Sequence, residues 1–238
     1  MKQTVYITGA DRGLGLSLSK VFLEKNFRVF AGRYMNDWPE LDELKKQFDE
    51  DLEIISLDVT NQQSVDEAAR LISEKANGQL DILINNAAIY KDRSKDIFGE
   101  FYYDDMMKLY DTNVFGPLRV SQSVVPLLMK GERKMLANIS SEAGSLADSW
   151  RIKEYGYCMT KSALNMQLTI LQNHLKDFGI KVLALHPGYV KTYIMGDFNH
   201  EATIEAVESA TGIVNEILKA PAIEEHMFID YQGNKMNW

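Results

Sequence analysis

Short apolar runs alternate with longer amphipathic stretches along nearly the whole chain. A run of about four to eight apolar residues predicts a buried strand, and a longer stretch with apolar positions three and four apart predicts a helix. By this pattern we expect strands at 3–8, 27–31, 53–57, 80–85, 134–139, 181–186 and 227–231. The first helix is expected to end near 25, and later helices to cover 40–49, about 61–76, 103–129, 157–178 and 204–219.

Strands that alternate with helices predict an α/β fold: a Rossmann-type, doubly wound parallel sheet of about seven strands with helices on both faces. No linker, internal repeat or low-complexity segment interrupts the pattern, so we expect a single domain over residues 1–238. Thr60 and Gln63 resemble a capping box that starts the third helix. Gly116-Pro117 is expected to bend the long helix 103–129.

Composition narrows the class of protein without indicating a reaction. The chain has 238 residues, a net charge of −8, four histidines and a single cysteine, Cys158. One cysteine excludes an internal disulfide, and no Cys/His spacing typical of zinc sites is present, so no metal is expected. The negative charge argues against nucleic acid as a partner. Because no apolar run is long enough to span a bilayer and no signal-peptide layout is present, we expect a cytoplasmic protein without a membrane partner.

A glycine-rich turn follows the first expected strand and precedes the first helix. It reads Thr8-Gly9-Ala10-Asp11-Arg12-Gly13-Leu14-Gly15. Glycines let the backbone turn tightly and approach a pyrophosphate, whose charge is favoured at the free N–H groups of a helix N-terminus. The spacing G-x₃-G-x-G differs from the better-known G-x-G-x-x-G dinucleotide turn. Taken alone, it is also compatible with an ordinary strand–helix connection.

Further motifs follow this turn in chain order. They are Asn85-Asn86-Ala87-Ala88, Asn113-Val114-Phe115-Gly116, Ser140-Ser141, Tyr157-x₃-Lys161 and Pro187-Gly188-Tyr189-Val190-Lys191-Thr192. Together with the glycine-rich turn, the series resembles the motifs of the short-chain dehydrogenase/reductase family over roughly residues 4–192. The chain departs from the family pattern at Ala88, where the family has glycine. It also departs around 146–153, where about three extra residues separate Ser141 from Tyr157.

The resemblance implies a nicotinamide cofactor and assigns its contacts. Gly9, Gly13 and Gly15 would hold the pyrophosphate. Asp58 would lie at the adenine ring, and Thr192 would hydrogen-bond the nicotinamide carboxamide. The full cofactor-binding set that we predict is Gly9, Asp11, Arg12, Gly13, Leu14, Gly15, Arg33, Asp58, Val59, Asn86, Ala87, Ala88, Tyr157, Lys161, Pro187, Gly188, Val190 and Thr192.

Tyr157 and Lys161 stand four residues apart, so on a helix they share one face. A nearby ammonium favours the phenolate and lowers the pKa of a tyrosine, which lets Tyr157 exchange a proton with a carbonyl or alcohol oxygen. The resemblance implies that Lys161 also holds the ribose hydroxyls. It adds two catalytic residues: Ser141 would hydrogen-bond the substrate oxygen, and Asn113 would hold a water that relays the proton.

Neighbouring residues offer alternatives to this assignment. Ser140 precedes Ser141, which we prefer because the second serine of the family's pair usually acts. Tyr155 lies six residues from Lys161 and therefore faces a different side of the helix. A serine hydrolase that uses these serines with His186 is disfavoured, because the sequence has no G-x-S-x-G turn.

We expect a preference for NADP(H), with NAD(H) still possible. Dehydrogenases selective for NAD commonly place an acidic residue just after the second strand. Here residues 31–34 read Ala-Gly-Arg-Tyr, and no acid follows before Asp37. Arg33 and Arg12 can pair a 2′-phosphate through charge-assisted hydrogen bonds. The alternative is that both arginines are merely exposed.

The end of the sequence narrows the family further. Residues 228–238 resemble the ending of C-factor and sniffer-like carbonyl reductases. This resemblance implies an NADP(H)-dependent reductase of a small carbonyl substrate, or a dehydrogenase of the matching alcohol, and we expect a homodimer or homotetramer. It also supports a second hypothesis, a signalling or regulatory protein that binds the cofactor and turns over little. Trp238 either covers the core or lies at the rim of the substrate pocket or a dimer contact.

Overall fold

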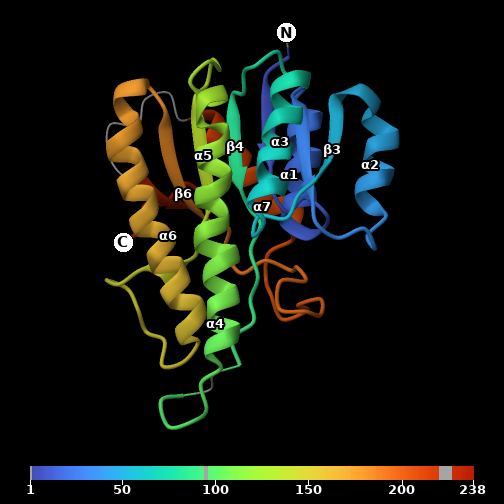
Figure 1. Cartoon of the computed structure of the whole chain (residues 1–238). Helices are drawn as coiled ribbons and strands as arrows, with labels where there is room; N and C mark the ends of the chain where they lie inside the picture. Colours follow the sequence, from blue (N-terminus) through green and yellow to red (C-terminus); the bar gives the residue numbers. More distant parts are fainter. Residues whose placement is uncertain (1, 94–95, 220–226) are drawn as a thin grey trace.

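A computed structural model describes residues 2–93, 96–219 and 227–238, and the strands in these ranges form one sheet (Figure 1). They are β1 (Thr4–Ile7), β2 (Arg28–Arg33), β3 (Leu52–Ser56), β4 (Ile82–Asn85), β5 (Met135–Ile139), β6 (Lys181–His186) and β7 (Met227–Asp230). The order is β3-β2-β1-β4-β5-β6-β7, and every pairing is parallel. The predicted Rossmann-type parallel sheet is confirmed.

Helices cover both faces of the sheet because each strand sends alternate side chains to opposite sides. In β1, Val5 and Ile7 contribute to one apolar core and Tyr6 to the other. The first core is closed by α1 (Gly13–Glu24), α2 (Glu40–Phe48) and α7 (Ala206–Lys219). The second is closed by α3 (Gln62–Lys75), α5 (Gly116–Leu128) and α6 (Tyr155–Leu175), which stand in front of the sheet in Figure 1.

The order of the strands creates a crevice between the loops that follow β1 and β4. β1 lies between β2 and β4, so the connections leave to opposite sides at the carboxyl ends of the strands. Asn86, which follows β4, donates its Nδ2 to the carbonyl oxygens of Thr8 and Gly9 at 2.9 Å each. The topology therefore joins two predicted motifs at one edge of the sheet.

The stretch predicted as one bent helix is divided into two. α4 (Tyr103–Tyr110) and α5 are joined by a π-helical turn at Asp111–Phe115, and together they form the central column of Figure 1. The irregularity thus lies just before Gly116-Pro117 instead of at these residues. A π turn is wider than an α turn, so it moves the side chains it carries to a different side of the helix.

The predicted capping box at the start of α3 is wrong. Asn61 is the capping residue, and its side-chain oxygen accepts the N–H of Ser64 at 3.1 Å. Thr60 instead donates its hydroxyl to Asp58 at 2.7 Å. Asparagine caps a helix at least as well as threonine, so the one-residue shift leaves the helix equally well started.

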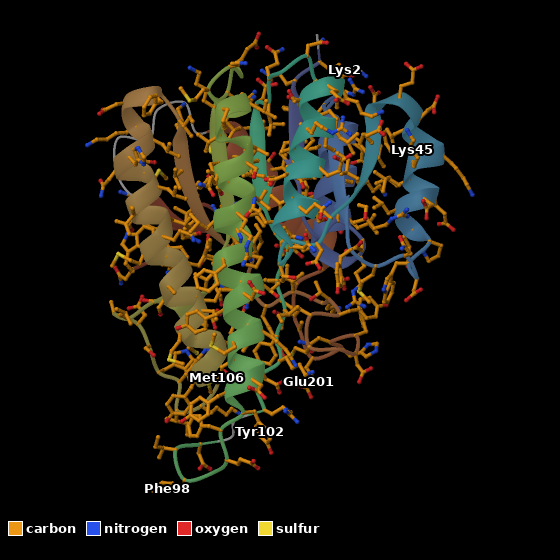
Figure 2. All side chains as sticks on the ribbon, in the orientation of Figure 1. Lys2, Lys45, Phe98, Tyr102, Met106 and Glu201 are labelled. Atoms are coloured by element: carbon orange, nitrogen blue, oxygen red, sulfur yellow. The ribbon has the colours of Figure 1, made fainter. Side chains whose placement is uncertain are left out.

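The loop before α4 and the last residues of the chain differ in how exposed their side chains are. Figure 2 shows Phe98 at the tip of the loop before α4, where its side chain is 96% exposed. The last residues return to the core: the rings of Trp238 and Phe228 lie 5.3 Å apart, and Trp238 packs against the second core. This packing favours the interpretation that Trp238 covers the core. In the described ranges, no helix has the length and apolar character needed to cross a bilayer.

Candidate active site

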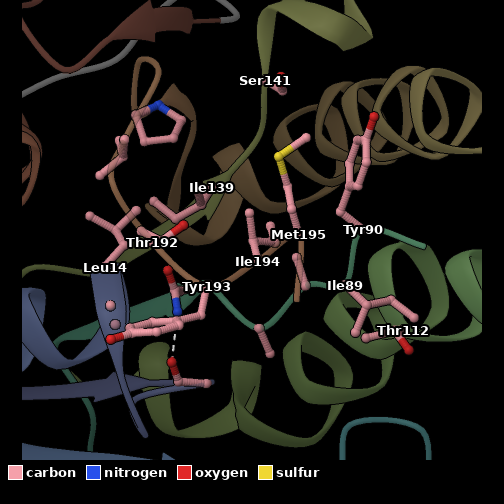
Figure 3. Close-up of a pocket in the computed structure, with 18 of the residues that line it drawn as sticks. Leu14, Ile89, Tyr90, Thr112, Ile139, Ser141, Thr192, Tyr193, Ile194 and Met195 are labelled. Carbon is pink, nitrogen blue, oxygen red and sulfur yellow. Dashed lines mark hydrogen bonds between the residues drawn. The ribbon is translucent and has the colours of Figure 1, made fainter. Parts of the chain in front are cut away.

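A large cavity opens at the carboxyl ends of the strands, with a volume of about 1040 Å³. This is the upper end of the usual range for small-molecule sites, so a dinucleotide and a second small molecule have room. Figure 3 shows part of its wall, with Leu14 and Thr192 near one end and Ser141 and Tyr90 farther along. The predicted residues on the wall are Gly9, Asp11, Arg12, Gly13, Leu14, Gly15, Asp58, Val59, Asn86, Ala87, Ala88, Ser141, Tyr157, Lys161, Pro187, Gly188, Val190 and Thr192. Of the predicted set, Arg33 and Asn113 do not line it.

The glycine-rich turn requires glycine for two different reasons. Gly9 and Gly13 have φ angles of +64° and +56°, which residues with a side chain rarely adopt. At Gly15 the constraint is space, because a Cβ there would lie 2.1 Å from the Gly9 carbonyl oxygen. The turn leads into α1, whose first N–H groups have no partner within the helix. A narrow backbone turn that presents free N–H groups fits a pyrophosphate.

The segment after β6 closes against this turn. The Cβ and Cγ2 atoms of Thr192 lie 3.4 Å from the position that a Cβ on Gly13 would occupy. Farther back, Ser209 in α7 donates its hydroxyl to the Pro187 carbonyl oxygen at 2.7 Å. The predicted Pro187–Thr192 motif therefore forms a wall of the cavity that α7 holds in place.

Two predicted carboxylates shape the loops around the cavity. Asp11 Oδ1 accepts the N–H groups of Tyr34 at 2.7 Å and Met35 at 3.1 Å, which ties the glycine-rich turn to the end of β2. Burial raises the pKa of Asp11, and these hydrogen bonds act against the rise. Asp58 Oδ1 accepts the N–H and the hydroxyl of Thr60 at 2.9 and 2.7 Å. Both carboxylates are thus held by local hydrogen bonds at the cavity wall.

The two arginines predicted to bind a 2′-phosphate have different surroundings. Arg33 Nη1 lies 2.9 Å from both carboxylate oxygens of Asp42, and Arg33 is not on the cavity wall. Arg12 is on the wall, with its guanidinium 4.5 Å from the Trp38 ring and 5.2 Å from the Tyr193 ring. Within the described residues it has no acidic partner, and it donates only to the Tyr193 carbonyl at 3.5 Å. Arg12 is therefore available to an anion, whereas Arg33 would first have to leave Asp42.

The predicted catalytic residues Ser141, Tyr157 and Lys161 meet on one side of the cavity. Lys161 is 2% exposed, and its Nζ donates to the Ile139 carbonyl at 2.9 Å. The same Nζ lies 5.7 Å from the centre of the Tyr157 ring. Ser141, two residues after β5, donates its hydroxyl to Glu142 at 2.6 Å and lowers the pKa of Tyr157. Residues from β5 and from α6 are thus brought together as predicted.

Burial determines the proton affinities of this group. It raises the pKa of Tyr157, and the charge of Glu142 raises it further, while Ser141 and Arg151 lower it. Burial also lowers the pKa of Lys161 to about 8. The raised pKa of Tyr157 differs from the predicted lowering, because burial outweighs the neighbouring groups that stabilise the phenolate. A phenol that keeps its proton is suited to donate it to a carbonyl oxygen.

Asn113 lies in the π-helical turn behind the cavity wall and is 1% exposed. Its side-chain oxygen accepts the Ile89 N–H, and its Nδ2 donates to the Ile89 carbonyl, both at 2.9 Å. Nδ2 also lies 3.4 Å from Thr160 Oγ1. The side chain therefore fastens the loop after β4 to the start of α6. The proposed role of Asn113 in a water relay stays a prediction.

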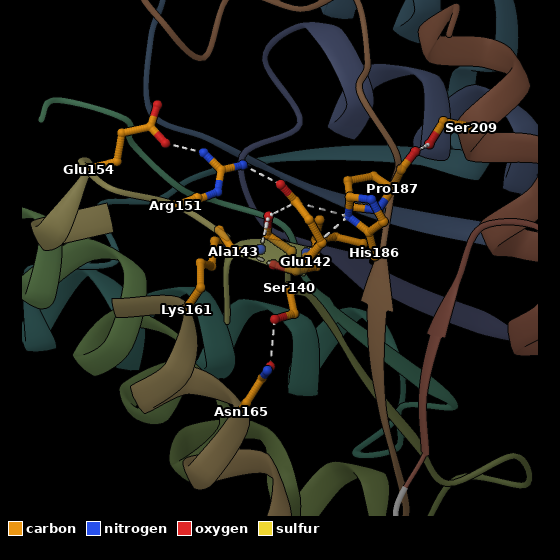
Figure 4. A network of polar contacts seen from close by, with 12 residues as sticks. Ser140, Glu142, Ala143, Arg151, Glu154, Lys161, Asn165, His186, Pro187 and Ser209 are labelled. Atoms are coloured by element: carbon orange, nitrogen blue, oxygen red, sulfur yellow. Dashed lines mark hydrogen bonds and ion pairs between the residues drawn. The ribbon is translucent and has the colours of Figure 1, made fainter. Parts of the chain in front are cut away.

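The two alternative residues have partners outside the predicted catalytic group. Ser140 Oγ donates to Asn165 Oδ1 at 2.6 Å (Figure 4). The ring of Tyr155 packs edge-to-face against Phe101, with centroids 5.2 Å apart, and Tyr155 is not on the cavity wall. Ser140 lines the cavity, but its hydroxyl is held by Asn165, whereas Tyr155 serves packing.

His186 lines the cavity without forming the pair that a serine hydrolase needs. Its Nδ1 accepts the Glu142 N–H at 3.4 Å, and burial lowers its pKa. The Ser141 hydroxyl donates to the Glu142 carboxylate. A hydrolytic serine instead requires a hydrogen bond to its general base.

A group of charged and aromatic residues beside Tyr157 was not predicted from the sequence. Glu142, Arg151, Glu154 and Tyr90 all line the cavity. Figure 4 shows Arg151 between the two glutamates, with which it forms ion pairs. The extra length at 146–153 was the available signal. It indicates an unusual loop, but it does not indicate which of the charged residues turns inward.

Residues 3–203 match the family model described as short chain dehydrogenase. The chain belongs to this family. Carbonyl reductase Sniffer of D. melanogaster has a TM-score of 0.92 and 28% identity to this chain, with 100% of both chains covered. The NADPH-bound carbonyl reductase from chicken fatty liver has a TM-score of 0.88 and 32% identity, covering 100% of this chain and 99% of that one.

A curated relative supports the same branch of the family. C-signal of Myxococcus xanthus is 34% identical over 161 residues, which cover 68% of this chain and 94% of that protein. The resemblance to C-factor and sniffer-like proteins is thereby confirmed. As a short-chain dehydrogenase, the protein is an enzyme of the oxidoreductase class.

Proposed function

We propose that this short-chain dehydrogenase reduces a small carbonyl compound with NADPH and catalyses the reverse oxidation of the alcohol with NADP. The proposal rests on one observation: Ser141, Tyr157 and Lys161 line the same cavity as the glycine-rich turn. The similarity to two carbonyl reductases, one of them with bound NADPH, supports the substrate class and the cofactor.

The side chains divide the work as follows. When bound, the nicotinamide supplies or accepts the hydride. When substrate binds, Ser141 turns its hydroxyl from Glu142 to the substrate oxygen and stabilises the charge that develops there. Tyr157 gives its proton to this oxygen during reduction and takes it back during oxidation. Lys161 holds the ribose hydroxyls, and Asn113 holds the water through which the proton is replaced.

The preference for NADP(H) rests mainly on Arg12. Its guanidinium lies on the cavity wall between two aromatic rings and lacks an acidic partner in the described chain. A free guanidinium binds phosphate through short, charge-assisted hydrogen bonds. Arg33 binds the same phosphate only after its ion pair with Asp42 is broken. NAD(H) remains a usable but weaker cofactor in this proposal.

A spectrophotometric assay tests the proposed function. Purified protein is mixed with NADPH, and separately with NADH, and a panel of aldehydes, ketones and quinones. We expect turnover of at least one carbonyl compound and a lower KM for NADPH than for NADH. The absence of turnover across the panel, measured on protein that binds NADPH in calorimetry, would contradict the proposed reaction.

Binding of NADPH without turnover would favour the other candidate function, a signalling or regulatory protein that binds NADP(H) and turns over little. The similarity to a protein named C-signal is the observation that favours it. Such a protein would keep the glycine-rich turn and Arg12, while substitutions at Tyr157 would leave its biological readout unchanged.

We also propose that the protein forms a homodimer or homotetramer. α5 and α6 carry exposed apolar side chains, among them Leu118, Met166 and Ile170, and a second copy of the chain would cover them. Sedimentation equilibrium gives the mass directly. A monomer at micromolar concentration would contradict the proposal.

A further inference from the structure

Arg151 links two carboxylates at the reaction end of the cavity. It pairs with Glu142 on one side and with Glu154 on the other, and its guanidinium carbon lies 5.0 Å from the centre of the Trp150 ring (Figure 4). Arg151 comes from the segment of extra length before α6, and all three charged residues line the cavity. An arginine that bridges two acids in a partly buried place is fixed in orientation by its planar donors.

Both ends of this bridge reach Tyr157. On one side, Glu142 accepts the hydroxyl of Ser141, and both residues act on the pKa of Tyr157. On the other, Glu154 accepts the hydroxyl of Tyr90, whose ring packs edge-to-face on the Tyr157 ring with centroids 4.8 Å apart. Arg151 is therefore connected to the surroundings of the predicted proton donor through both of its glutamates.

The bridge also holds the start of the helix that carries Tyr157. Glu154 lies directly before α6 and has a φ of +65°, a left-handed conformation that is uncommon for residues other than glycine. The contacts of its side chain with Arg151 and Tyr90 hold it in this conformation. A change at Arg151 therefore acts on α6 as well as on Glu142.

We propose that Arg151 is a positioning residue of the reaction, which holds Glu142 on Ser141 and balances the charge of this carboxylate beside Tyr157. The inference rests on the proposed function, because it requires Tyr157 to be the proton donor. Arg151 contacts neither of the reacting oxygens in this proposal and acts only through its neighbours.

Arg151 and Glu142 act on Tyr157 with opposite signs. A guanidinium stabilises the phenolate and a carboxylate opposes it, which agrees with the effects of these residues on the pKa of Tyr157. The other titratable groups that face Tyr157 or Glu142 are Tyr90, Asp92, Glu154, Cys158, Lys161 and His186. They are unchanged in the variants below.

The test compares the pH profiles of Arg151→Gln, Glu142→Gln and the double variant, each measured for reduction and for oxidation. Loss of Arg151 raises the pKa of Tyr157, so the midpoint of both profiles moves to higher pH. We expect a shift of about one pH unit for the loss of one nearby charge. Loss of the Glu142 charge moves the midpoint to lower pH by a similar amount. In the double variant the two changes cancel to a large part.

Two controls separate charge from structure. Arg151→Lys keeps the charge and is expected to retain a midpoint near that of the unmodified protein. Arg70 is a matched control, because it also pairs with two glutamates, Glu67 and Glu74, but on the exposed surface of α3. Arg70→Gln removes the same charge and is expected to leave both midpoints unchanged.

A second measurement follows the phenol itself without cofactor. Ultraviolet absorbance records tyrosinate formation, and subtraction of the Tyr157→Phe titration isolates Tyr157. Midpoints that move in the same direction for Arg151→Gln and Glu142→Gln, or that do not move, would overturn the inference. If Arg151→Gln fails to fold, a Glu142→Gln midpoint that stays in place overturns it alone. Failure of the proposed function is distinguishable, because it would appear as no turnover by the unmodified protein or as an active Tyr157→Phe variant, whereas the ultraviolet titration of Tyr157 needs no turnover.

Discussion

At the glycine-rich end of the cavity, the surface predicted to hold the pyrophosphate is main chain. Gly9 and Gly13 form the turn, and the side chain of Asn86 bonds to the carbonyl oxygens of Thr8 and Gly9. At the Tyr157 end, the wall is side chain. Arg151 comes from a loop, Glu142 from a short 3-10 helix after β5 and Glu154 from the residue before α6, and their contacts are ion pairs and hydrogen bonds between side chains.

This difference separates what the fold provides from what the loops provide. A wall of main chain accepts the same phosphate in any protein that forms the turn, and it tolerates no larger residue at its tightest point. A wall of side chains on loops can be replaced without disturbing the sheet, and it determines which carbonyl compound fits. The predictions below test whether the two ends separate in this way, in order of expected effect.

Tyr157→Phe tests the chemistry of the side-chain end. The ring and its packing against Tyr90 are retained, and only the transferable proton is lost. Loss of such a general acid lowers kcat by about 10²–10⁴-fold, while the Kd for NADPH is expected to stay within a few-fold. Steady-state kinetics and calorimetry measure the two. A variant with half of the normal kcat would exclude Tyr157 as the acid, and Tyr155 would be tested next.

Gly15→Ala tests the main-chain end. The added methyl would lie 2.1 Å from the Gly9 carbonyl oxygen and 2.6 Å from Asn86 Nδ2, so the turn must shift. Overpacking of this kind costs about 1–3 kcal/mol, and we expect a lower Tm and NADPH binding weakened by at least about tenfold. Gly99→Ala is the control, because a Cβ there meets nothing closer than 3.6 Å. Unchanged NADPH affinity in Gly15→Ala would break the comparison.

Arg12→Ala and Arg33→Ala test whether side chains also contribute at the glycine-rich end of the cavity, because both arginines are predicted to bind the 2′-phosphate there. A charged hydrogen bond contributes about 1.5–3 kcal/mol, so Arg12→Ala is expected to weaken NADPH binding by roughly tenfold or more. NADH binding should change little. The effect of Arg33→Ala is expected to be smaller, since Arg33 is paired with Asp42. Equal losses for NADPH and NADH in Arg12→Ala would remove the proposed contact.

Trp238→Ala has the smallest expected effect and tests whether the tail belongs to either end of the cavity. Trp238 packs on Phe228 and is not on the cavity wall. Loss of a partly buried ring costs about 1–2 kcal/mol, so the Tm should fall by several degrees while KM and oligomeric mass stay unchanged. A raised KM or an altered mass at an unchanged Tm would instead place Trp238 at the pocket rim or a subunit contact.

Most of the fold was predictable because a parallel sheet buries both faces of its strands. Runs such as Ile82, Leu83 and Ile84 in β4 are therefore apolar without interruption, and they stand out from their surroundings. The Tyr157–Lys161 pair was predictable for a related reason, since residues four apart on a helix share a face. The spacing of the glycines also predicted the glycine-rich turn. Gly9 and Gly13 are required by their own φ angles, and Gly15 by the nearby Gly9 carbonyl oxygen.

Features that depend on distant partners were not predictable from one sequence. Arg151 reads as one more surface arginine until the fold brings Glu142 to it. Arg33 reads as a phosphate ligand until Asp42 is seen to hold it. The π-helical turn gave no signal, because the residues around Asn113 are compatible with an ordinary α-helix. Such features arise from tertiary contacts, which the period of apolar residues does not encode.

That π-helical turn has a consequence for insertions and deletions. A hydrogen bond from residue i to i+5 accommodates one residue more than an α turn, and a residue added to a regular helix rotates everything beyond it by about 100°. At Asp111–Phe115 the extra residue is absorbed locally, so Leu109 and Val120 on either side both stay buried. A one-residue deletion here would leave two sound helices but would turn Asn113 away from Ile89. The position of Asn113 therefore depends on the number of residues in this helix as well as on their identity.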